Sequence, residues 1–137
     1  MLRWIDVVKR ANFGNPSVEN KIVKTNDEWK AILSDEQYFI TRESGTEQAH
    51  SAAMCGLFEP GIYVCICCKT PLFDSDVKYQ SGTGWPSFTQ PISENAIAYH
   101  KDKSDGKYRI EVTCNTCNAH LGHVFRWAKT KRIALLH

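Results

Sequence analysis

The stretch that most constrains the fold is residues 109–125, RIEVTCNTCNAHLGHVF. Its first residues alternate polar and apolar side chains, as expected of a strand with one face in water. A Cys-x-x-Cys turn follows from Cys114 to Cys117, and His120 and His123 come directly after it. The segment therefore predicts a β-rich domain in which a strand leads into paired thiols and then into two imidazoles.

An earlier segment repeats the paired-thiol pattern. Cys65-Ile66-Cys67-Cys68 comes directly after the apolar run 62–64. Two residues between thiolates let one tight turn direct both sulfurs at one ion, and two such turns complete a tetrahedral four-sulfur shell, which suits Zn²⁺. A closed shell has no open position, so the predicted zinc is structural. Cys67 is expected to face away from the ion as a buried apolar side chain.

Other uses of these cysteines stay open. The chain has six cysteines, and in a reducing compartment clustered cysteines are more often metal ligands or redox groups than disulfides. Two redox pairs and an iron–sulfur cluster are alternatives to zinc. Because sequence does not prove the compartment, a disulfide framework is a further alternative.

The rest of the chain predicts one antiparallel β domain with a small helical part near its start. β-Branched and aromatic runs predict strands at 62–64, 97–99 and 108–112. Glycine, proline and small polar residues predict turns at 60–61, 81–84 and 104–106.

Two capping boxes predict two short helices. Thr25 with Glu28 begins the first, and the serine at 34 with the glutamine at 37 begins the second. Trp29, Ile32 and Leu33 share one face of the first helix. Residues 1–24 are expected to be a polar lead-in with a turn at 14–16.

Composition is that of a globular protein. Of 137 residues, 42% are hydrophobic and 23% are charged, which argues against disorder. No run approaches the ~18 apolar residues of a membrane span, and the first residues lack the apolar core of a secretory signal. The net charge of +2 is too small to predict a nucleic acid or an anionic membrane as partner. A soluble cytoplasmic domain is expected.

Two features are candidates for a binding pocket. Trp85 follows two glycines in SGTGWPSF at 81–88, so its indole is expected either as one wall of an apolar pocket or as a core residue. His120 and His123 could bind zinc, but the cysteines already supply four ligands. A proton donor beside a pocket and a structural role are the interpretations that stay open for them.

Taken together, these segments resemble the methionine-R-sulfoxide reductase B family. The resemblance runs in register from about residue 25 to Phe125. The stretches that carry it are TRxxGTE at 41–47, PGxYxCxxC at 60–68, PLF at 71–73, SGxGWPSF at 81–88 and RxEVxCxxCxAHLGHVF at 109–125. The resemblance implies a mainly β fold of antiparallel sheets, of the β-tent or SelR-like kind, with short N-terminal helices and a structural zinc held by a pair of knuckles.

The resemblance also implies an activity. The family reduces the R epimer of methionine sulfoxide, free or in proteins. A nucleophilic cysteine attacks the sulfoxide sulfur, methionine leaves, and the cysteine becomes a sulfenic acid. A second cysteine then forms a disulfide, which thioredoxin reduces. We expect a monomer that uses thioredoxin as its reductant.

Site residues carry over by position. The zinc ligands that the resemblance implies are Cys65, Cys68, Cys114 and Cys117. Trp85 matches the indole that receives the S-methyl group of the substrate. His120 matches a histidine that helps protonate the sulfoxide oxygen or position water, and His123 and Arg109 are further candidates at the same site.

The resolving cysteine has two possible places in the family. Thr83 stands where many members carry it, so that arrangement is absent here. Cys55 fits the second arrangement, in which the resolving cysteine lies in an earlier loop. Asp105 stands where some members have a histidine, which puts that contact in doubt.

The sequence departs from the family at residues 126–137, RWAKTKRIALLH. Members continue here with a segment like Asp-Gly-Pro-Lys-Pro-Thr-Gly-Leu-Arg-Tyr-Cys-Ile-Asn, whose cysteine is the nucleophile. This stretch contains no cysteine. Read from the second base of each codon, Arg126 and Trp127 can encode Asp-Gly, residues 128–130 can encode Pro-Lys-Pro, and residues 132–137 can encode Gly-Leu-Arg-Tyr-Cys-Ile.

We therefore hypothesise a frameshifted reductase, by mutation or sequence error, that lacks its nucleophile as written. The expected organisation is a lead-in at 1–24, a reductase-like domain at 25–125 and an aberrant tail at 126–137. Loss of the last strand is expected to leave a sheet edge exposed, with residues 129–132 as a solvated basic tail.

Two other functions are compatible with the residues. One is a non-catalytic zinc domain that binds oxidised-methionine peptides or a protein partner. The other is a zinc-ribbon module for nucleic acid, against which the small net charge and the missing basic-aromatic stripe both count. Stereospecific turnover of the R-sulfoxide would separate the reductase from both.

Overall fold

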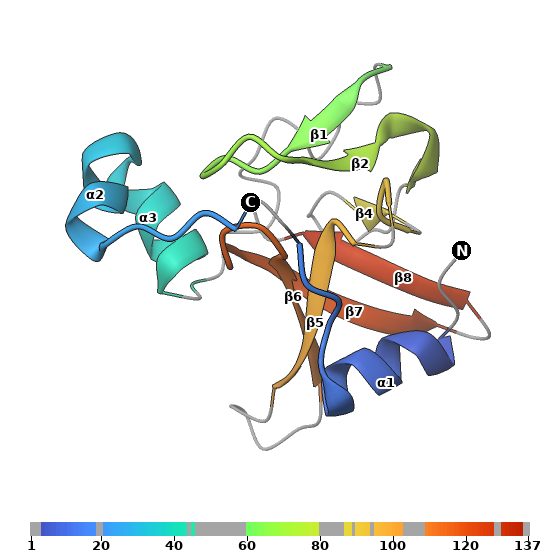
Figure 1. The fold of residues 1–137 in the computed structure, drawn as a ribbon. Coiled ribbons are helices and arrows are strands. Elements are labelled where there is room, and N and C mark those ends of the chain that lie inside the picture. Colours follow the sequence, from blue (N-terminus) through green and yellow to red (C-terminus); the bar gives the residue numbers. More distant parts are fainter. Residues whose placement is uncertain are drawn as a thin grey trace.

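The computed structural model describes residues 4–18, 21–43, 45, 60–79, 87–88, 90–93, 95–102, 109–127 and 130–135. These residues form short helices and two antiparallel sheets, so the predicted mainly β fold is confirmed (Figure 1). Within these ranges, no helix has the length and apolar character needed to cross a membrane.

The two capped helices lie where the capping boxes predict them. α2 spans Asn26–Ile32 and α3 spans Asp35–Arg42. In the first box the Thr25 hydroxyl accepts from the Glu28 amide at 3.2 Å, and the Glu28 carboxylate accepts from the Thr25 amide at 3.1 Å. Of the three apolar residues expected to share one helical face, Trp29 and Leu33 are buried and Ile32 is 55% exposed.

A third helix, α1 (Trp4–Phe13), lies within the expected lead-in, where the sequence pattern does not predict it. It packs on strand β5 and buries Val7 completely. The helix ends at Phe13, after which Gly14 adopts a φ of 110° and its amide donates to the Arg10 carbonyl at 3.0 Å. The turn predicted at 14–16 is thereby confirmed at its first residue.

The smaller sheet pairs β1 (Ile62–Val64) with β2 (Pro71–Asp74), so the strand predicted at 62–64 is confirmed. The turn that joins the two strands carries the first Cys-x-x-Cys motif. Tyr63 lies opposite Phe73 in this ladder. Both strands lie above the larger sheet in Figure 1.

The larger sheet has the strand order β3-β4-β8-β7-β6-β5. Its strands are β3 (Lys78–Tyr79), β4 (Ser87–Phe88), β5 (Ile97–Asp102), β6 (Arg109–Cys114), β7 (His120–Trp127) and β8 (Thr130–Leu135). β5 contains the predicted run 97–99, and β6 contains the described part of the run 108–112. The turn between β6 and β7 carries the second Cys-x-x-Cys motif.

The core lies between the two sheets and under α1. Phe73 of the small sheet stacks on Phe88 of β4, with ring centroids 4.4 Å apart. Tyr99, Val112 and Leu121, from three neighbouring strands, are almost fully buried in the same cluster. Packing of Phe73 on Phe88 places the turn of the small sheet over the β6–β7 end of the large sheet.

The expectation that the last strand is missing is wrong. The backbone of β8 pairs with β7 from Gly122↔Leu135 to Trp127↔Thr130, and β4 pairs with its other side. Residues 130–132 therefore belong to a strand rather than to a solvated tail. The pairing needs only backbone amides and carbonyls, which any non-proline residue supplies.

Candidate functional site

The two Cys-x-x-Cys turns have the same backbone geometry. In each, the residue four positions after the first cysteine has a left-handed φ, 65° for Lys69 and 64° for Asn118. Its amide donates to the carbonyl of the first cysteine at 2.8 Å in both turns. The amide of the first cysteine also donates at 2.9 Å, from Cys65 to the Thr70 carbonyl and from Cys114 to the Ala119 carbonyl. These bonds make each turn tight enough to direct both sulfurs the same way.

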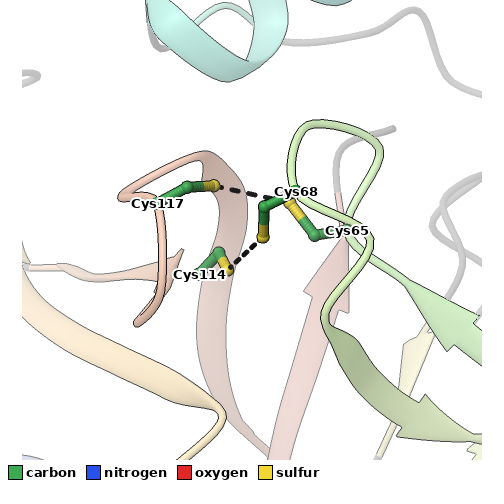
Figure 2. A group of neighbouring side chains, drawn as sticks. All are labelled: Cys65, Cys68, Cys114 and Cys117. Atoms are coloured by element: carbon green, nitrogen blue, oxygen red, sulfur yellow. Dashed lines mark hydrogen bonds between the residues drawn. The ribbon is translucent and has the colours of Figure 1, made fainter. Parts of the chain in front are cut away.

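The sulfurs of the two turns meet (Figure 2). The Sγ atoms of Cys65 and Cys117 lie 3.7 Å apart, and those of Cys68 and Cys114 lie 3.6 Å apart. All four sulfurs lie within 4.8 Å of one another. A tetrahedron with metal–sulfur bonds of about 2.3 Å has edges of about 3.8 Å, close to the observed distances. The four cysteines can therefore hold one metal ion, as the sequence predicts.

The close contact of the four cysteines shifts the pKa values of their thiols in different directions. Hydrogen bonding to Cys117 lowers the pKa of Cys114 to about 2. Hydrogen bonds to Cys114 raise the pKa of both Cys65 and Cys117 well above the ordinary thiol range. A bound cation would replace the protons of these thiols, because metal ligation requires thiolates.

Cys67 lies beside this group. The side chain is 7% exposed, so its predicted burial is confirmed. Its thiol contacts the cluster rather than facing away from it, since hydrogen bonding to Cys117 and Cys65 lowers the pKa of Cys67 to about 3. Cys67 is nonetheless outside the set of four sulfurs with ligand spacing.

Two segments from the N-terminal part hold the second turn in place. Arg42 of α3 donates from Nη2 to the Cys117 carbonyl at 2.7 Å, and its guanidinium lies 4.5 Å from the centre of the Trp29 ring. The Ile22 amide donates to the Thr116 carbonyl at 2.8 Å. α3 and the segment after α1 thus fix the backbone that presents the second pair of sulfurs.

Asn115, inside the second turn, is a further anchor. It is 2% exposed, and its Nδ2 donates to the carbonyls of Pro16 at 2.9 Å and of Asn95 at 3.1 Å. Its Oδ1 accepts from Lys21 Nζ at 3.2 Å. The side chain of a residue between two ligands therefore ties the turn to the N-terminal segment and to the start of β5.

An irregularity in the β6–β7 ladder brings the two histidines together. Val112 pairs with Gly122, but Thr113 pairs with His120, so one residue of β7 has no partner. Residues three apart in a regular strand point to opposite faces, and an extra residue restores them to the same face. The rings of His120 and His123 consequently lie 5.6 Å apart, edge to face.

Each histidine contacts a carboxylate on another strand. His120 Nδ1 lies 2.6 Å from Glu111 Oε2, and His123 Nε2 lies 2.8 Å from Asp102 Oδ2. The histidines are 3% and 7% exposed. Among the described residues, the Nε2 atom of His120 is buried and has no hydrogen-bond partner. The pairs place two fixed imidazoles on one face of the large sheet.

Of the other site residues that the sequence predicts, Arg109 lies on β6 opposite Asp102. Trp85, Cys55, Thr83 and Asp105 lie outside the described residues. Their relation to the histidines stays a prediction.

Sequence reasoning missed the two carboxylates. Glu111 alternates with the buried residues of its strand, which marks it as belonging to the polar face. Nothing in the sequence indicates that the neighbouring strand brings an imidazole to it. Asp102 falls beyond the run predicted as a strand, so only the length of β5 reveals its position.

Fold and site together define an antiparallel β domain with a four-cysteine metal-binding site and a face of paired histidines and carboxylates. Residues 33–134 match the sequence profile of the SelR domain. The peptide methionine sulfoxide reductase MsrB of Azotobacter vinelandii is 50% identical over 106 residues, 77% of this chain and 80% of the relative. The peptide methionine sulfoxide reductase MsrB of Pseudomonas aeruginosa is 52% identical over 106 residues, again 77% of this chain and 80% of the relative.

A third such protein, from Saccharophagus degradans, is 50% identical over 105 residues, 76% of this chain and 78% of the relative. The chain belongs to the methionine-R-sulfoxide reductase B family. The profile match continues past Phe125 through most of β8.

Proposed function

We propose that this protein is a reductase of methionine-R-sulfoxide, free or in proteins, by way of a cysteine sulfenic acid and a disulfide. The observation that carries the proposal is identity of about half the residues over 106 positions with peptide methionine sulfoxide reductases. Thioredoxin is the proposed reductant and the cytoplasm the proposed compartment. Stereospecific turnover tests the proposal, since the S epimer should remain unreacted.

The proposed pocket combines residues from several strands and loops. Trp85 receives the S-methyl group, and His120 protonates the sulfoxide oxygen or positions water, with His123 and Arg109 nearby. Support comes from the edge-to-face pairing of the two histidines and the burial of both rings. Cys55 is the proposed resolving cysteine.

The metal proposed for the four-cysteine site is zinc. Sulfur separations of 3.6 and 3.7 Å fit tetrahedral zinc–sulfur bonding. Four protein ligands leave no open position, so the ion would stabilise the junction of the two sheets and take no part in the reaction.

The sequence as given contains no cysteine after Cys117. We propose that residues 126–137 are read in a shifted frame and that the second-base frame encodes the nucleophile of the family. Sequencing the gene across the codons from Phe125 to beyond His137 tests this directly. The hypothesis fails if the second-base frame does not spell the family segment.

If the present frame stands, a non-catalytic zinc domain that binds oxidised-methionine peptides or a protein partner becomes the favoured function. The missing thiol is the observation that favours it, because neither Cys67, buried within a knuckle, nor Cys55 is an obvious substitute nucleophile. Binding of an R-sulfoxide peptide without release of methionine would support this alternative over the reductase.

A further inference from the structure

Glu111 and His120 form a short hydrogen-bonded pair across β6 and β7. The 2.6 Å separation of Oε2 and Nδ1 is slightly shorter than the range of about 2.7–2.9 Å for a charge-assisted N–H···O hydrogen bond. The His120 side chain is 4% exposed and that of Glu111 is 22% exposed, so water screens the pair only on the carboxylate side. The contact is diagonal across the ladder, since Thr113 is the residue directly opposite His120.

The chemistry of the pair determines which ring nitrogen carries hydrogen. An ionised carboxylate only accepts, so the Nδ1 atom of His120 must donate to Glu111. In the neutral ring, Nε2 then holds the lone pair. Among the described residues this Nε2 is buried without a partner, and leaving such an atom unpaired is unfavourable. A partnerless buried nitrogen in a fixed ring indicates a place for a polar group of a ligand.

We propose that Glu111 is a positioning residue that holds His120 in its Nδ1–H form, so that any proton exchanged with the substrate passes through Nε2. The inference rests on the proposed function, in which His120 faces the sulfoxide oxygen. In the protonated ring both nitrogens carry hydrogen. The N–H bond at Nε2 breaks, its electron pair stays on Nε2, and an O–H bond forms at the sulfoxide oxygen.

The bond from Nδ1–H to Glu111 is the same before and after this transfer. The ring therefore needs neither rotation nor a change of tautomer between its two charge states. Without Glu111, the neutral ring could carry its hydrogen on either nitrogen. A ring with hydrogen on Nε2 and a free Nδ1 would present the wrong group for accepting the proton back.

Nitrogen-15 NMR of histidine in the zinc-loaded full chain tests the inference without substrate. At the alkaline end of a titration, where the ring is neutral, we expect His120 to show a single tautomer with hydrogen on Nδ1. Glu111→Gln and Glu111→Ala should convert this signal to a mixture of both tautomers. Asp102→Asn is the matched control, since it should perturb His123 and leave the tautomer of His120 unchanged.

Hydrogen on Nε2 of His120 in the unmodified protein would overturn the inference, and so would Glu111 variants that retain zinc and keep the Nδ1–H form. If the variants do not fold, the spectrum of the unmodified chain still decides. Addition of methionine-R-sulfoxide to the same sample tests the proposed function separately. A lack of any shift at the His120 ring would count against that function, while the tautomer stands on its own evidence.

Discussion

The Sγ atoms of Cys68 and Cys114 lie 3.6 Å apart although 46 positions separate the two residues in the chain. The first belongs to the turn of the small sheet and the second to the end of β6 in the large sheet. An ion bound here closes a long loop and joins the two sheets. Because the entropy lost in closing a loop grows with its length, the unfolded chain is disfavoured most by cross-links of this kind.

Cys114→Ser should abolish metal binding and with it the stable fold. Structural zinc sites contribute about 10–16 kcal/mol of apparent binding free energy, which is comparable to the whole stability of a typical domain. Metal content by mass spectrometry and unfolding by circular dichroism measure the effect. Cys67→Ala is the matched control, and it should retain one zinc per chain. Equal metal content in both variants would contradict the four-cysteine site.

Asn15→Ala should loosen the attachment of the N-terminal segment to β5. The Asn15 side chain accepts from the Tyr99 amide at 2.9 Å and donates to the Tyr99 carbonyl at 3.0 Å. Loss of these bonds should cost about 1–3 kcal/mol and accelerate hydrogen exchange at the Tyr99 amide. Asn12→Ala removes an exposed bond to the Val8 carbonyl within the same helix and should change stability by less than about 0.5 kcal/mol. Similar costs for both variants would refute a specific anchor.

Gly45→Ala should destabilise the end of α3. A Cβ at this position would overlap the ring of Phe39, whose carbonyl also accepts from the Gly45 amide at 2.9 Å. Phe39 is 51% exposed, so its ring can move outward and the cost should stay within about 1–3 kcal/mol. Gly61→Ala is the control, because no atom lies within 4 Å of its added Cβ. Thermal unfolding of both variants checks the difference, and an unaffected Gly45→Ala protein would argue against this packing.

α2 should lose its cap in acid while α3 keeps its own. The backbone hydrogen bond with Thr25 holds the pKa of Glu28 below its ordinary value of 4.5. A carboxyl with a lowered folded-state pKa stabilises the fold above its unfolded-state pKa, and this contribution disappears as the pH falls through the folded value. The second box uses the neutral Gln37, which does not titrate.

Carboxyl carbon NMR of Glu28 measures this titration between about pH 2 and pH 6, a range that brackets the ordinary pKa values of carboxyl groups. Thr25→Ala should return the Glu28 pKa toward its ordinary value. An unchanged titration in that variant would show that the capping bond does not cause the shift.

Structural features that depend on only a few neighbouring residues could be predicted from the sequence. The capping boxes span four positions each and determine where α2 and α3 begin, and the spacing of Cys65 and Cys68 determines the geometry of one turn whatever lies around it. The sequence alone could not show that Trp29 is buried and Ile32 exposed, since both occupy apolar positions of one short helix. Trp29 is buried with the Arg42 guanidinium 4.5 Å from the centre of its ring, whereas Ile32 is exposed.

Features that depend on strand pairing could not be predicted. The pairing of His120 with Glu111 requires the irregularity between Val112 and Thr113, which has no signature in the sequence. The same holds for β8, whose backbone pairs with strands on both sides. α1 could not be predicted for a different reason. A short helix is stabilised by tertiary contacts, such as the burial of Val7, rather than by its own sequence.

Stereospecific release of methionine tests the proposed function most directly. The R and S epimers are offered, with dithiothreitol as reductant, to the chain as given and to a chain whose residues 126–137 are replaced by the reading of the second-base frame. A third chain keeps leucine at position 136, which that frame reads as cysteine. We predict turnover of the R epimer by the restored chain and none by the other two. Turnover of the R epimer by the chain as given would contradict the proposal that it lacks its nucleophile, and an inactive restored chain that is folded and contains zinc would contradict the reductase function.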